Sequence, residues 1–101
     1  MKKEPVIFRK WKKSEGGSII ALFPQIPVST NSRFVLSYEH IGQHGAADPL
    51  IVKSKTVPAK LSDYKELKEE LENRGYILIV KKRFTEADRK EREKLIRKTT
   101  I

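Results

Sequence analysis

The chain has 101 residues, of which 22 are Lys or Arg and 13 are Asp or Glu, so its formal net charge is +9. This length supports one domain and not two. The lack of cysteine excludes a disulfide framework, thiolate metal ligands and cysteine nucleophiles.

The composition also predicts a location and a class of partner. No apolar run approaches the ~20 residues that span a bilayer, so we expect no membrane partner. Lys2 and Lys3 are not followed by the apolar segment of a signal peptide, and we expect a cytoplasmic protein. The basic charge, which both halves of the chain carry, favours anionic partners such as DNA or RNA.

The first part of the chain predicts an antiparallel meander. After a disordered tail of residues 1–4, three apolar segments are predicted strands, and they cover residues 6–11, 19–23 and 33–39. Gly16 and Gly17 can supply the positive φ of a hairpin turn between the first two strands. Pro24 should end the second strand, because proline cannot donate a hydrogen bond to a ladder.

Residues 40–49 are the least regular stretch, rich in glycine, histidine and alanine and poor in side chains to bury. We expect a loop there, in which Gly42 and Gly45 allow backbone N–H groups to turn toward an anion. Residues 52–58 follow as a short extended segment at a sheet edge.

An amphipathic helix is predicted next, with Ser62 as its N-cap and Gly75 as its stop. Its apolar stripe consists of Tyr64, Leu67 and Leu71. Residues 76–80 are apolar on both faces and predict a central strand that is covered on both sides.

A last helix is predicted from Thr85 to about Lys98, with Thr85 as N-cap and an acidic residue at Asp88. It has few apolar residues, so we expect it to dock loosely or to project. The element order β-β-β-α-β-α predicts an α+β fold, an antiparallel sheet of about four strands with helices on one face. We expect residues 5–84 to form the single domain and residues 85–101 to form a basic C-terminal helix that docks loosely or projects.

The run from Tyr38 to Asp48, together with residues 6–11 and the Gly75-Tyr76 junction, resembles a group of small uncharacterised proteins encoded by bacteria, phages and mobile elements. The resemblance covers most of residues 5–84. No activity is established for that group, so no catalytic role and no cofactor carry over. The resemblance implies an accessory intracellular protein with a connection to the DNA of mobile elements.

Basic residues beside aromatic rings are typical of surfaces that bind single strands, because charge follows the phosphates and rings stack on bases. We therefore predict a small basic module that binds nucleic acid with little sequence preference. Its predicted contacts are Arg9, Lys10, Lys12, Lys13, Gln43, His44, Lys81, Lys82 and Arg83. These side chains must form one positive strip beside His44 if all of them contact a single ligand.

Two other classes of function stay open. The sparse last helix and the apolar residues Ile51 and Val52 suggest a module that binds a protein partner or forms a homodimer. His40, His44 and Asp48 lie at four-residue intervals, and on a helix this spacing would align a metal site or a hydrolase site. Gly42 and Gly45 disfavour that helix. Catalysis is the weaker hypothesis, because the sequence offers no convergent set of reactive groups.

Overall fold

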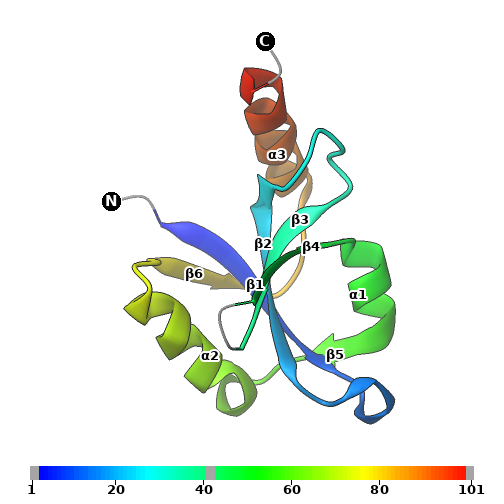
Figure 1. Cartoon of the computed structure of the whole chain (residues 1–101), viewed down its shortest axis with the longest axis vertical. Coiled ribbons are helices and arrows are strands. Elements are labelled where there is room, and N and C mark those ends of the chain that lie inside the picture. The colour runs from blue at the N-terminus through cyan, green and yellow to red at the C-terminus, as the bar shows by residue number, and fades with distance from the viewer. Residues whose placement is uncertain (1–2, 41–42, 100–101) are drawn as a thin grey trace.

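The computed structural model describes residues 3–40 and 43–99, which form a six-stranded mixed sheet with helices on both faces (Figure 1). The strands are β1 Glu4–Trp11, β2 Ile19–Pro27, β3 Val35–Glu39, β4 Gln43–Ala47, β5 Thr56–Pro58 and β6 Leu78–Lys81, and the helices are α1 Pro49–Lys55, α2 Leu61–Asn73 and α3 Glu86–Thr99. The strand order is β4-β3-β2-β1-β5, and β6 also pairs with β1. The α+β class is confirmed, whereas the number, order and direction of the strands differ from the prediction.

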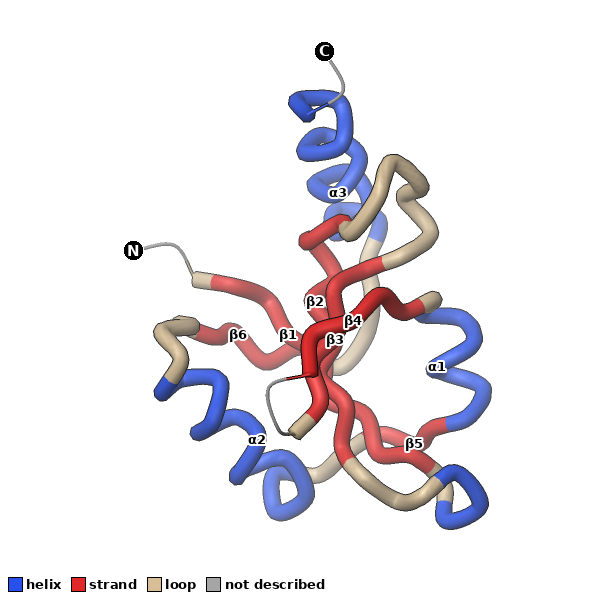
Figure 2. The backbone as a smooth tube through the Cα atoms, viewed as in Figure 1, coloured by secondary structure: helices blue, strands red, loops and turns tan. Residues whose placement is uncertain are grey.

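β1 is the strand around which both layers of the core are built. Its side chains alternate, so that Val6 and Phe8 face α2 while Ile7 faces α1, and all three are at most 4% exposed. Because β1 and β2 are apolar on both faces, each face requires a cover. The prediction of helices on one face is therefore wrong, and Figure 2 shows α1 and α2 on opposite sides of the strands.

The β1–β2 hairpin closes through a short 3-10 helix, Lys13–Glu15, followed by two glycines in the left-handed region. Gly16 has φ +106° and Gly17 has φ +74°, as the turn prediction requires. Pro24 does not end β2, contrary to the prediction. The strand continues to Pro27 through an irregularity in its pairing with β3 between Phe23 and Pro27, which accommodates a residue without an N–H group.

The prediction of a loop over residues 40–49 is wrong from residue 43 onward, and the predicted role of Gly42 lies outside the described residues. β4 pairs antiparallel with β3, with His44 opposite Tyr38 and Gly45 opposite Ser37. Asp48 then accepts a hydrogen bond from the Leu50 N–H at 3.0 Å and caps α1. Residues 43–46 of β4 are exposed and the strand shows no apolar alternation, so it forms through backbone pairing with β3 without a side-chain signal.

Residues 52–58 are not one extended edge segment. Their first part belongs to α1, where Val52 is buried against the sheet, and their last part is the three-residue strand β5. β5 pairs antiparallel with β1, with Thr56 opposite Trp11 and Pro58 opposite Arg9.

α2 agrees closely with its prediction except at its first turn. It begins at Leu61, because the Asp63 carboxylate accepts the Lys60 backbone N–H at 2.9 Å, so Ser62 lies inside the helix. Leu67 and Leu71 are buried as predicted. Gly75 follows the helix at φ +102°, a conformation in which a side chain would be strained.

β6 is an edge strand and not the predicted central strand. It runs parallel to β1 along residues 4–7 and, within the described residues, pairs with no other strand. β5 occupies the next part of the same β1 edge. Ile79 and Val80 are 44% and 38% exposed, so this strand is not covered on both faces.

α3 docks on β2 and, through Arg92, on Ser32 in the segment that follows β2, and its C-terminal end reaches away from the sheet in Figure 1. The buried residues of this contact, Asp88 and Arg92, are charged rather than apolar. The ranges that the structure describes include no helix with both the length and the apolar character needed to cross a membrane.

Candidate nucleic-acid interface

The predicted contacts do not lie on one strip beside His44. Arg9, Lys82 and Arg83 line one hollow on the α1 face of the sheet. Gln43 and His44 belong to β4, at the opposite edge of the sheet from β6. Lys10, Lys12, Lys13 and Lys81 do not line this hollow.

The hollow has a volume of about 260 Å³ and forms where the chain leaves β6 and passes under α1. We call it the basic cleft, and it is lined by Ile7, Arg9, Leu22, Pro49, Leu50, Lys53, Lys82, Arg83 and Phe84. Ile7 and Leu22 are core residues and form an apolar floor, while the basic residues come from β1, α1 and the segment after β6. No acidic residue is among the lining residues.

Arg9 is held in the cleft by neutral partners. Its Nε donates to Thr56 Oγ1 at 2.9 Å and its Nη2 donates to the Thr56 carbonyl at 3.1 Å. Burial lowers the pKa of Arg9, yet an arginine stays protonated in proteins. Among the described residues, Lys53, Lys82 and Arg83 also form no ion pair with a carboxylate. The positive charge of the cleft is therefore not neutralised locally.

Lys53 was missed by the sequence reasoning. It lies in α1, and residues 52–58 were predicted to be extended, which would have pointed its side chain elsewhere. The Asp48-Pro49 pair is the signal that could have found this helix. Asp is a preferred N-cap and Pro is preferred at the first helical position.

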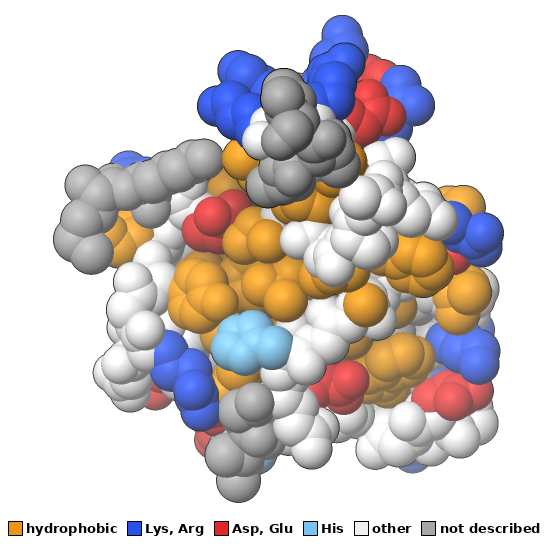
Figure 3. All heavy atoms as spheres, turned by 45° about the horizontal axis from the view of Figure 1, so that its top comes forward, with side chains coloured by type: hydrophobic (Ala, Val, Ile, Leu, Met, Phe, Trp, Pro, Cys, Tyr) orange, Lys and Arg blue, Asp and Glu red, His pale blue; other side chains and the backbone are white. Residues whose placement is uncertain are grey.

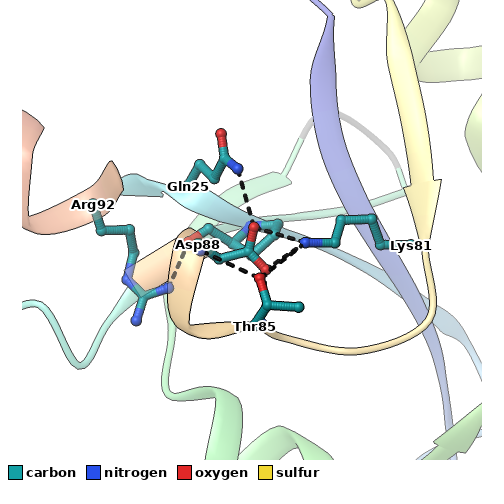
Figure 4. Close-up of polar contacts among 6 residues, drawn as sticks. Gln25, Lys81, Thr85, Asp88 and Arg92 are labelled. Carbon is teal, nitrogen blue, oxygen red and sulfur yellow. Dashed lines mark hydrogen bonds and ion pairs between the residues drawn. The ribbon is translucent and has the colours of Figure 1, made fainter. Parts of the chain in front are cut away.

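Lys81 forms an ion pair with the buried carboxylate of Asp88 (Figure 4). Its Nζ lies 2.7 and 2.8 Å from the two carboxylate oxygens of Asp88, which has no exposed surface. Gln25 Nε2 donates to the same carboxylate at 3.0 Å and the Thr85 N–H does so at 2.9 Å. Burial alone would raise the pKa of Asp88, but these hydrogen bonds outweigh it and the pKa lies below its usual value.

Arg92 completes this group, which we call the Asp88 network: Gln25, Lys81, Thr85, Asp88 and Arg92. The Arg92 guanidinium donates to the Pro24 carbonyl at 2.5 Å and to the Ser32 carbonyl at 3.0 Å. It thereby satisfies backbone groups beside the irregular part of β2. The network ties α3 to the sheet, and Lys81 contributes to the fold rather than to an open positive surface.

The predicted contacts Lys10, Lys12 and Lys13 are not among the residues that line the cleft. Lys10 is on the α2 face and pairs with Asp63 at 3.4 Å. The hydrogen bond from the Lys60 backbone, and also Lys10, hold the pKa of Asp63 below its usual value. Lys12 donates to the Ser54 carbonyl at 3.2 Å, and Lys13 opens the hairpin turn.

Gln43 and His44 lie on the outermost strand. His44 Nε2 is 3.2 Å from the Tyr76 hydroxyl, and its ring meets the Tyr38 ring edge-on with centroids 4.7 Å apart. In Figure 3 hydrophobic side chains cover much of the viewed face, and Lys and Arg side chains gather at its margins. The environment of His44 is therefore aromatic, and no basic residue of the cleft is brought to it.

The hypothesis of a metal or hydrolase site at His40, His44 and Asp48 is wrong in its geometry. Asp48 caps α1 and pairs with Arg33 at 2.5 Å, while His40 contacts Glu70 and His44 contacts Tyr76. His44 and Asp48 stand at opposite ends of β4. Within residues 3–40 and 43–99, no group of three or more His, Cys, Asp or Glu side chains could hold a metal ion.

Fold and site together define a small α+β protein with a basic cleft at the β5–β6 edge of its sheet. No family model, curated protein or solved structure matches this chain.

Proposed function

We propose that this protein is a cytoplasmic module that binds nucleic acid, with little sequence preference, through the basic cleft. One observation carries the proposal. Four basic residues from three parts of the chain, Arg9, Lys53, Lys82 and Arg83, surround one hollow that no acidic residue lines. Such a group neutralises phosphates without a competing carboxylate, and phosphate contacts supply affinity without reading sequence.

The apolar part of the cleft supports a nucleic acid over a simple anion. Phe84 is half-buried at the cleft wall, and Leu50 stands beside it with 74% of its surface exposed. Aromatic and apolar surface next to unpaired positive charge suits a ligand whose flat bases alternate with phosphates. The resemblance to small proteins of phages and mobile elements implies a connection to DNA, which is consistent with this proposal.

The test compares two double variants that each remove two charges. Lys82→Ala/Arg83→Ala removes charge from the cleft, whereas Lys12→Ala/Lys13→Ala removes it from the hairpin turn. We expect fluorescence anisotropy with a labelled DNA or RNA strand to show about a tenfold loss for the first pair and less than about threefold for the second. The slope of log affinity against log salt should fall by about 1.4 for the first pair, because each phosphate contact on a single strand contributes about 0.7.

Two results would contradict the proposal. One is the absence of binding at low salt, and the other is an equal loss in both double variants. All four side chains are exposed, and circular dichroism of each variant checks that the fold is retained.

A second candidate function, self-association, is favoured by the free edge of β6. This strand pairs only with β1 among the described residues and exposes Ile79 and Val80. A second copy could add a strand there. Of the two apolar residues predicted to contact a partner, Val52 is buried and Ile51 is 50% exposed, so Val52 does not support a partner surface. Light scattering of the wild type and of Ile79→Lys decides this candidate, and a wild-type monomer at all concentrations removes it.

A further inference from the structure

A second hollow opens on the α2 face of the same sheet edge, between α2 and β6. It has a volume of about 720 Å³, and we call it the α2–β6 groove. Its apolar wall includes Phe8, Leu61, Tyr64 and Val80, and no acidic residue is among its lining residues. The volume lies within the range of about 300–1,000 Å³ that is usual for ligand sites.

Lys82 and Arg83 line both the groove and the basic cleft. This follows from the pairing of β1, because Pro58 of β5 lies opposite Arg9 and Lys81 of β6 lies opposite Ile7. The carboxyl ends of β5 and β6 thus approach each other at the sheet edge beside Phe8. An extended ligand that crosses this sheet edge would pass from the basic cleft to the α2–β6 groove over Lys82 and Arg83.

The groove contains an aromatic ring that is already fixed in place. Tyr64 stacks on Phe8 with centroids 4.5 Å apart and planes 4° from parallel, so its orientation costs little to fix on binding. Leu61 at the groove is 63% exposed and Val80 is 38% exposed. Exposed apolar surface beside a rigid ring, with Lys60 and Lys82 nearby, suits a flat apolar group attached to an anion.

We infer that the bound nucleic acid is single-stranded, and that one base enters the α2–β6 groove while Lys82 and Arg83 contact the adjoining phosphate. This inference rests on the proposed function. In a duplex the bases are stacked and paired inside the helix, so the groove could receive a base only from a strand in which the bases are free.

The experiment compares three probes with equal labels: a short single strand, the same strand in a duplex, and an abasic strand with the same number of phosphates. We expect the base-bearing single strand to bind about tenfold more tightly than either of the others. Stacking of one base contributes about this factor. Tyr64→Leu should weaken binding of the base-bearing strand about tenfold and leave binding of the abasic strand unchanged.

Because Tyr64 stacks on a core residue, its replacement could disturb the fold, and a measurement on the wild-type protein is needed as well. A strand carrying bromouracil is irradiated in the complex, and the cross-linked peptide is identified by mass spectrometry. We expect cross-links at residues 60–64 or 78–84, and cross-links confined to other segments overturn the inference.

The outcomes separate the inference from the function on which it rests. Equal, salt-dependent binding of single strand, duplex and abasic strand overturns the inference and leaves the proposed function in place. If none of the probes binds at low salt, the proposed function itself fails. A competitor of inorganic polyphosphate with matched charge should displace the abasic strand more readily than the base-bearing strand.

Discussion

Asp88 holds a negative charge at a position with no exposed surface. A buried carboxylate is stable only when cations and donors replace its lost hydration, and here Lys81, Gln25 and Thr85 do so. These partners come from β6, β2 and the start of α3, so one side chain joins three elements. The network explains how a helix with few apolar residues docks on the sheet.

Replacing this carboxylate should be costly. Asp88→Asn removes the charge and leaves Lys81 without its counter-charge, and we expect the free energy of unfolding to fall by about 3 kcal/mol. Urea denaturation measures it. Glu86→Gln is the matched control, because Glu86 pairs with Arg89 on the exposed surface of the same helix and should change stability by less than about 0.5 kcal/mol. A variant Asp88→Asn as stable as the wild type would show that the network contributes little.

At the scale of elements, β1 and β6 differ in how they are held. β1 pairs with β2 on one edge and with β5 and β6 on the other, and its residues 5–8 are buried. β6 has four residues and, in the part of the chain that the structure describes, pairs on one side only. Since local opening is easiest where pairing and burial are least, the two strands should open with different free energies.

Hydrogen exchange tests this difference. We expect the amides of β1 and β2 to exchange most slowly, close to the rate set by global unfolding, and those of β4 and of the last turns of α3 to exchange fastest. β6 should lie between these extremes. Mass spectrometry of short peptides resolves the strands, and equal protection of β6 and β1 would argue against an edge position for β6.

At the scale of the whole molecule, the net charge of +9 is less informative than its distribution. Lys10, Lys81 and Arg89 are paired with carboxylates, whereas the basic residues of the cleft have no carboxylate partner within residues 3–40 and 43–99. Asp63 and Asp88, the partners of Lys10 and Lys81, make stability depend on pH, because hydrogen bonds and ion pairs favour their ionised forms.

The pKa values of Asp88 and Asp63 are both lowered in the folded protein. The unfolded chain therefore binds protons first as the pH falls, so stability is fully present above about pH 4 and is lost as the pH falls through the lower, folded pKa values. We expect the free energy of unfolding, measured from neutral pH downward, to decline in this acid range. Asp88→Asn should flatten the decline, and an unchanged profile in this variant would contradict the assignment to Asp88.

The elements that the sequence predicted well are those with signals in neighbouring residues. The Gly16-Gly17 turn, the stripe of Leu67 and Leu71, and Gly75 after α2 all act within a few positions and are found in the structure. β4 could not be predicted in this way, because Gly45 and its neighbours carry no alternation and the strand exists through pairing with β3. The edge position of β6 also depends on distant pairing, because β5 occupies residues 9–11 of β1 and β6 pairs with residues 4–7.

The candidate site also has a part that the sequence predicted and a part that depends on tertiary structure. Arg9, Lys82 and Arg83 were predicted as contacts and lie together, but their convergence with Lys53 depends on α1, which the sequence reasoning missed. Lys10 and Lys81 were predicted alongside them and are instead paired with Asp63 and Asp88. Lys10 pairs with a carboxylate 53 positions away, and Lys81 pairs with one seven positions away on a different element. Sequence spacing alone therefore does not show which lysine is free for a phosphate.

The sequence by itself determined the α+β class, the first hairpin, the second helix with its stop and the start of the last helix, because propensity, capping and turn chemistry act between near neighbours. Only the tertiary structure decided the strand order, the exposed edge and which basic residues pair with carboxylates. The physical reason is that strand pairing and charge neutralisation join residues such as Lys10 and Asp63, which are 53 positions apart.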